Sequence, residues 1–174
     1  QPKSEDIPHP DRNRSFIVAS EHVETTGSEL IVINGAEITR QLPLGHSNAV
    51  FVTDATGLRV IDVTHPERPR LVEDARVALD DGQRIYLART YAYVAAKSQG
   101  LAIINIENPE KPAVYDLFTA EGQIADARDV IVGSTNASLF AYVADGAAGI
   151  KVIQLTSPDS QPRYYGFSPE PKPE

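Results

Sequence analysis

The sequence contains no cysteine, no methionine and no tryptophan among its 174 residues. Without cysteine the chain can form no disulfide, no thiolate nucleophile, no cysteine-ligated zinc site and no covalent haem attachment through a Cys-x-x-Cys-His motif. The absence of thiols suits an oxidising compartment, although it does not by itself identify one.

Basic residues are also scarce: Lys and Arg number 16 against 24 Asp and Glu, which gives a formal charge of -8. This balance argues against nucleic acids and anionic membrane surfaces as partners, because both attract a basic face. Apolar residues make up 41% and charged residues 23%, the composition of an ordinary globular domain. No apolar run approaches the 18 or so residues of a membrane-spanning helix.

One unit is repeated along the chain. The repeats begin at Gly57, Gly100 and Gly149, at spacings of 43 and 49 residues, and read GLRVIDVTHPERPRLV, GLAIINIENPEKPAVY and GIKVIQLTSPDSQPRYY. Each is preceded by a matching run, AVFVTDAT, YAYVAAKSQ or FAYVADGAA, and a degraded copy with FIVAS and LIVIN lies near the start. Such a period is typical of propeller blades.

Each unit predicts a hairpin of two apolar strands with a short turn ending in glycine, which tolerates positive φ. The predicted hairpins are 51–54 with 58–63, 91–96 with 101–106, and 139–145 with 150–155. A proline phrase follows each hairpin and should lead into an outer edge strand, since proline cannot donate to a sheet ladder. The phrases contain Pro66 and Pro69, Pro109 and Pro112, and Pro158 and Pro162; the edge strands are expected at 70–75, 113–118 and 163–167.

Both faces of the second hairpin strand are apolar in every unit. Leu58 and Val60 lie on one face and Ile61 and Val63 on the other; Leu101/Ile103 with Ile104/Ile106 and Ile150/Val152 with Ile153/Leu155 repeat this pattern. A sheet with one wet face would alternate apolar and polar residues, so both faces should be covered by neighbouring sheets. We therefore predict an all-β fold: a β-propeller or partial propeller of about four antiparallel, four-stranded blades.

The repeated phrase resembles the LVIVD repeat of bacterial and archaeal surface or secreted proteins. The resemblance covers about residues 16–167 and implies a β-propeller and an exported location: extracellular, cell-surface or periplasmic. It implies no defined catalytic chemistry. Members of the family often accompany other exported modules, some of them multihaem cytochromes, so a cytochrome partner is one expectation.

The domain organisation follows from the repeats. We expect an extended segment at 1–15, repeat units at about 16–42, 43–75, 82–118 and 127–167, and a tail or linker at 168–174, where proline alternates with charged residues. The first unit is one strand short. The ring is therefore either an irregular four-bladed one or is completed by a longer chain or other subunits.

Candidate chemistry is sparse. Asp80, Asp81 and Asp145 are the candidates for calcium, but the Asp-x-Asp-x-Asp-Gly loop is absent and ordinary turns explain these residues, so no metal or other cofactor is assigned. The polar strand residues Asp62, Asn105, Gln154 and Asn34 either face an axial channel or satisfy neighbouring backbone groups. No catalytic residue is assigned.

The leading functional hypothesis is a non-enzymatic, exported scaffold that binds protein. The alternative is a lactonase-like or lyase-like propeller enzyme with a metal in its axial channel. An open propeller would expose its end blades, so we expect contacts with another copy, the remainder of a longer chain or a different protein. The interface candidates are Phe16, Tyr164, Tyr165 and Phe167.

Overall fold

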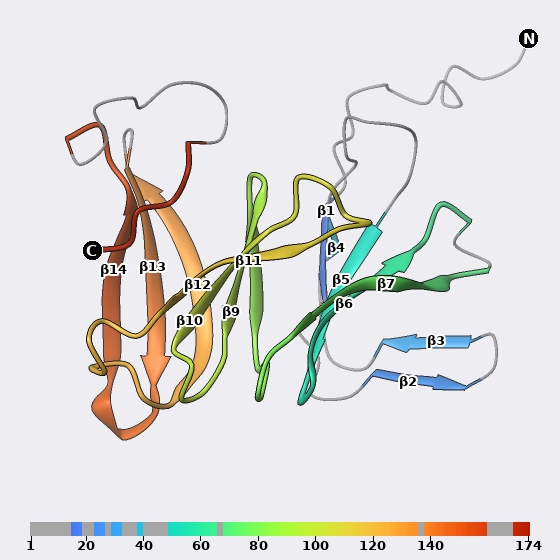
Figure 1. Cartoon of the computed structure of the whole chain (residues 1–174), viewed down its shortest axis with the longest axis horizontal. Helices are drawn as coiled ribbons and strands as arrows, with labels where there is room; N and C mark the ends of the chain where they lie inside the picture. Colours follow the sequence, from blue (N-terminus) through green and yellow to red (C-terminus); the bar gives the residue numbers. More distant parts are fainter. Residues whose placement is uncertain are drawn as a thin grey trace, which may run out of the picture.

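The computed structural model describes residues 15–18, 23–26, 29–32, 38–39, 49–65, 68–135, 138–159 and 169–174, with side chains described from residue 49 onward. Among these residues, strands and turns make up the structure, and the one helical segment is a 3-10 turn at Gly146–Ala148 (Figure 1). The prediction of an all-β fold is confirmed. No helix in the described part of the chain is long and apolar enough to cross a membrane.

Three larger sheets follow one another along the chain (Figure 1). The first sheet has the order β4-β1-β5-β6-β7, with β1 at Ser15–Val18, β4 at Ile38–Thr39, β5 at Ala49–Asp54, β6 at Gly57–Asp62 and β7 at Arg70–Ala78. The second sheet contains β8 (Ile85–Ala88), β9 (Tyr91–Ala95), β10 (Leu101–Asn105) and β11 (Ala113–Phe118). The third contains β12 (Ala127–Thr135), β13 (Ser138–Asp145) and β14 (Ile150–Thr156).

All three predicted hairpins are present as antiparallel pairs: β5 with β6, β9 with β10, and β13 with β14. The outer strands expected at 70–75 and 113–118 are β7 and β11, each paired with the second hairpin strand. The outer strand expected at 163–167 lies outside the described residues.

The start of the chain departs from the repeat. β1 pairs in parallel with β5 and antiparallel with β4, whereas β3 (Glu29–Val32) pairs with β2 (Val23–Thr26) in a separate two-stranded sheet. The two runs that resemble a hairpin in the sequence therefore lie in different sheets. The reason is local: only two residues separate VETT from ELIV in the sequence, so these two strands pair with each other.

The core consists of two apolar layers, one on each face of the second sheet. Ala92, Val94, Ala102 and Ile104 belong to the layer shared with the first sheet, which we call the first core layer. The intervening residues of the same strands belong to the layer shared with the third sheet, the second core layer: Tyr91, Tyr93, Ala95, Leu101 and Ile103. The prediction that both faces of this sheet are covered is confirmed.

The three sheets approach one another near their inner edges, because β8 lies beside both β1 and β12. Sheets stacked face to face in chain order, with their inner strands adjacent, are consistent with consecutive blades of a β-propeller.

Glycine is required at the hairpin turns for two separable reasons. Gly100 and Gly149 both have positive φ, 74° and 81°, which side chains rarely adopt. A Cβ at Gly100 would also overlap the carbonyl oxygen of Phe118 on β11, whereas a Cβ at Gly149 would meet nothing within 4 Å. Gly57, in the first hairpin, has a φ of 127° and the same kind of overlap, with Val77.

We predict that Gly149→Ala costs about 1–3 kcal/mol of unfolding free energy through backbone strain alone. Gly100→Ala should cost about 1–3 kcal/mol more, because the clash with β11 adds to the strain. Urea melts of the two variants against the parent measure the difference. Equal losses would show that the close approach of β11 to Gly100 is absent in solution.

Candidate functional site

The second proline phrase begins as a β-turn. Lys111 N–H donates to the carbonyl of Asn108 at 3.0 Å, which places Pro109 at the second turn position. In the first phrase Arg68 N–H donates to the carbonyl of His65 at 2.8 Å. Pro112 is buried, Pro69 and Pro109 are partly buried, and Pro158 is exposed; Pro66 and Pro162 lie outside the described residues.

A polar side chain ends the second hairpin strand in two of the sheets. Asp62 Oδ1 accepts the backbone N–H of Thr64 at 2.9 Å, and Asn105 Oδ1 accepts that of Glu107 at the same distance. Asp62 and Asn105 therefore satisfy neighbouring backbone groups, which is one of the two roles that the sequence allows for them. Backbone atoms of Gln154 pair instead with Glu174, and Asn34 lies outside the described residues.

Asp62 has a second partner. Its Oδ2 accepts hydrogen bonds from Arg70 Nε at 2.9 Å and Nη2 at 2.8 Å, across β6 and β7. Partial burial raises the pKa of Asp62, but the hydrogen bonds from Thr64 and Arg70 outweigh burial and hold the pKa below its ordinary value.

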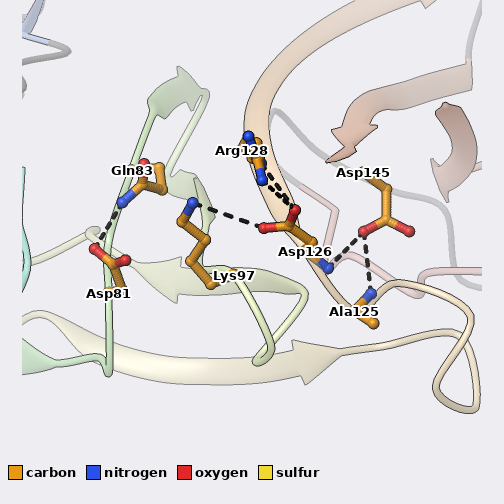
Figure 2. A network of polar contacts seen from close by, with 7 residues as sticks. All are labelled: Asp81, Gln83, Lys97, Ala125, Asp126, Arg128 and Asp145. Atoms are coloured by element: carbon orange, nitrogen blue, oxygen red, sulfur yellow. Dashed lines mark hydrogen bonds and ion pairs between the residues drawn. The ribbon is translucent and has the colours of Figure 1, made fainter. Parts of the chain in front are cut away.

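The calcium candidates are not assembled into one site. Asp81 Oδ1 accepts the side-chain amide of Gln83 at 2.6 Å, and Asp80 N–H donates to Gln99 Oε1 at 2.9 Å. Asp145 is buried and accepts the backbone N–H groups of Ala125 and Asp126 at 3.0 and 2.7 Å (Figure 2). Among the described residues no group of three or more His, Asp or Glu side chains could hold a metal ion.

A neighbouring set of residues joins the second and third sheets. Lys97, in the β9–β10 turn, exchanges two backbone hydrogen bonds with Ala127 at the start of β12, at 2.9 and 3.1 Å. Beside this bridge, Asp126 pairs with Arg128 at 2.7 Å and with Lys97 at 3.6 Å (Figure 2). The hydrogen bond from Arg128 lowers the pKa of Asp126. The polar cluster therefore acts as a clamp between two sheets.

The face of the third sheet that points away from the second is apolar and exposed. Its exposed fractions are 58% at Ile131, 37% at Tyr142, 72% at Ile150 and 60% at Val152. Cross-strand pairing places Ile131 opposite Tyr142 and Tyr142 opposite Val152, so that these three side chains form one row across the sheet. We call this four-residue surface the open face.

The equivalent positions of the second sheet are covered. The runs YAYVA and FAYVA align Tyr93 with Tyr142, and the glycine-led runs align Leu101 with Ile150 and Ile103 with Val152. In the second sheet these side chains are at most 1% exposed and lie in the second core layer. The prediction that Ile150 and Val152 would be covered is wrong, because no further described sheet lies on that face.

The side chains of the four predicted interface residues lie outside what the structure describes. Phe16 is in β1, where the backbone alone is described, and Tyr164, Tyr165 and Phe167 lie outside the described residues. The sequence leads one to expect exposed end blades, and Tyr142 and Ile131 in the last described sheet are exposed, although neither is among the four named interface candidates. The signal available was the alignment of FAYVA with YAYVA, since a last copy of a stacked unit has no successor to cover it.

Residues 81–118 match the family model of the LVIVD repeat. This segment is similar to the LVIVD repeat. The match spans the whole second sheet, β8 to β11, and confirms the resemblance noted in the sequence for residues 81–118. No curated protein and no solved structure gives a significant match to the chain. Asn105, the strand-end acceptor of the LVIVD repeat, corresponds to Asp62 in the first sheet.

We predict that Asp62→Asn lowers the stability of the protein at pH 7 by no more than about 1 kcal/mol, because it keeps the acceptor for Thr64 but loses the ion pair with Arg70. A carboxyl with a lowered folded-state pKa stabilises the fold above its unfolded pKa of about 3.9, and this contribution disappears as pH falls through the folded pKa. The stability gap between parent and variant should therefore close below pH 4.

Asp62→Ala separates the two roles. It also removes the acceptor for Thr64, so it should cost roughly 1 kcal/mol more than Asp62→Asn at every pH. Thermal or urea unfolding between pH 2.5 and 7 measures both gaps. A gap between parent and Asp62→Asn that stays constant over this range would contradict the pairing of Asp62 with Arg70.

Proposed function

We propose that this chain is a non-enzymatic, exported β-propeller scaffold that associates with a second copy of itself through the open face of the third sheet. The observation that carries this proposal is the exposure of Ile131, Tyr142, Ile150 and Val152 in one contiguous surface. Exposed apolar surfaces of this kind mark interaction sites in soluble proteins.

The second sheet shows what such a face binds. Tyr93, Leu101 and Ile103, the equivalents of three open-face residues, pack against the flat aliphatic face of the third sheet, which contributes Val130, Val132, Ala141, Val143 and Leu155. The partner for the open face should therefore be another apolar sheet face. A second copy of this chain supplies one.

The shape and charge of the open face favour pairing with itself. The row Ile131–Tyr142–Val152 is centred on Tyr142, so a two-fold axis near this residue would place the row of one copy on that of the other. Three aliphatic side chains and a phenol carry no charge at neutral pH. Two chains of charge -8 can thus meet here without bringing carboxylates together at the centre of the contact.

The same side chains favour binding over catalysis as the role of this surface, since three of the four are aliphatic and supply no acid, base or nucleophile, and a single phenol is the one group there able to transfer a proton. An exported location is supported by the LVIVD repeat and by a sequence without thiols.

We predict that the chain dimerises at micromolar concentrations and that Val152→Glu weakens the dimer by at least about tenfold, because two carboxylates would be brought into an apolar contact. Raising the salt concentration should strengthen the parent dimer by screening the repulsion between acidic chains. Sedimentation velocity over a range of protein and salt concentrations measures both effects.

Leu117→Glu is the matched control, since Leu117 is 41% exposed on β11 in the second sheet, away from the open face. It should leave the dimer intact, and both substitutions should change stability by no more than about 0.5 kcal/mol, as is usual at exposed positions. A parent chain that remains monomeric at 100 µM in 0.5 M salt would overturn the proposal. Equal weakening by the two substitutions would place the contact elsewhere.

A further inference from the structure

The last residues of the chain pair with the outer edge of the third sheet. Glu174 and Gln154 exchange two backbone hydrogen bonds, each of 3.0 Å, and Lys172 N–H donates to the carbonyl of Leu155 at 2.7 Å. Exchange of both bonds between one pair of residues is the pattern of an antiparallel ladder. Residues 172–174, in the segment expected as an extended tail or linker, thus pair with the edge of β14 without forming a regular strand.

A β-bulge in β14 lies where the C-terminal segment pairs with this strand. Leu139 pairs with Thr156 and the next residue, Phe140, pairs with Gln154, so Leu155 is an extra residue without a partner of its own in β13. Its carbonyl accepts the N–H of Lys172 instead.

The prolines of the C-terminal segment are spaced so that it can donate backbone hydrogen bonds along one edge only. In a strand, successive N–H groups point to opposite edges, so if Lys172 and Glu174 donate toward β14, the N–H positions of residues 171 and 173 face outward. Both residues are proline and have no N–H to offer. Side chains alternate as well: Pro169 and Pro171 are buried, whereas Glu170, Lys172 and Glu174 are exposed.

We propose that the outer edge of β14, at Gln154 and Leu155, is a binding site for an extended peptide in which proline alternates with hydrogen-bond-donating residues, and that residues 169–174 are its ligand within the same chain. The ligand class is defined by backbone donors at every second residue and prolines between them. Such a strand completes the sheet and offers no donor for a further strand to join, a common protection of exposed edges.

The neighbouring sheet supports this placement of the segment. Tyr91 and Tyr115 meet edge to face with their ring centroids 5.4 Å apart, across the second sheet. Burial, the neighbouring Tyr115 and the nearby Glu170 and Glu107 carboxylates raise the pKa of Tyr91 to about 12. Glu170 thus affects the pKa of a tyrosine of the second sheet, while Lys172 and Glu174 pair with the third sheet.

The test is amide hydrogen exchange at Gln154 in the full chain. The double substitution Lys172→Pro/Glu174→Pro removes both donating N–H groups, and Lys172→Ala/Glu174→Ala changes the same two side chains while keeping them. We expect exchange at Gln154 to be at least about tenfold faster in the proline variant and within about twofold of the parent in the alanine variant. The synthetic peptide PEPKPE at millimolar concentration should restore protection in the proline variant.

Unchanged exchange at Gln154 in the proline variant would overturn the proposal. So would equal acceleration in both variants, since side chains rather than backbone donors would then hold the segment, or failure of the peptide to restore protection. Exchange at the buried Ile103 amide reports whether the fold is intact, and if it is not, Lys172→Pro alone is measured. None of these readouts depends on dimer formation.

Discussion

Burial of both faces of the second sheet is the constraint on which the rest of the structure depends. Alternate residues of β9 and β10 enter two different core layers, so Tyr93 packs toward the third sheet while Val94 packs toward the first. A slip of one residue in the pairing would exchange the two faces, bringing tyrosines to the layer that now holds alanine and valine. The register is therefore fixed by packing on both sides at once.

The same constraint explains why both faces of the third sheet are apolar. Its inner face is an aliphatic surface that covers the second sheet, and its open face retains the residue pattern of a surface that elsewhere in the molecule is covered. The polar clamp around Lys97, Asp126 and Asp145 holds the third sheet against the second at the turn end of the strands (Figure 2). A stacked unit of this kind ends in an exposed apolar face unless something binds there, and this is the basis of the proposed association.

Most of the regular structure could be predicted from the sequence, because the repeat, the glycine turns and the double-faced strands all point to the same hairpins. The parallel pairing of β1 with β5 could not, since the resemblance of FIVAS and LIVIN to a hairpin says nothing about the intervening strand that pairs with β3. The apolar pattern alone could not reveal the exposure of Ile150 and Val152, because it shows which faces suit burial, not which are buried; only the expectation of open end blades anticipated it. The pairing of residues 172–174 with β14 could not be predicted, because proline normally marks the end of pairing.

The central claim is that the second sheet is buried on both faces whereas the third is buried on one. Three identical truncations test it: Ile103→Ala in the second core layer, Ile104→Ala in the first, and Ile150→Ala on the open face. At a concentration where the chain is monomeric, the first two should each cost about 2–5 kcal/mol of unfolding free energy, as truncations of buried isoleucine do, and the third should cost less than about 1 kcal/mol. A small loss at either Ile103 or Ile104, or a loss at Ile150 equal to theirs, would contradict the stacked arrangement.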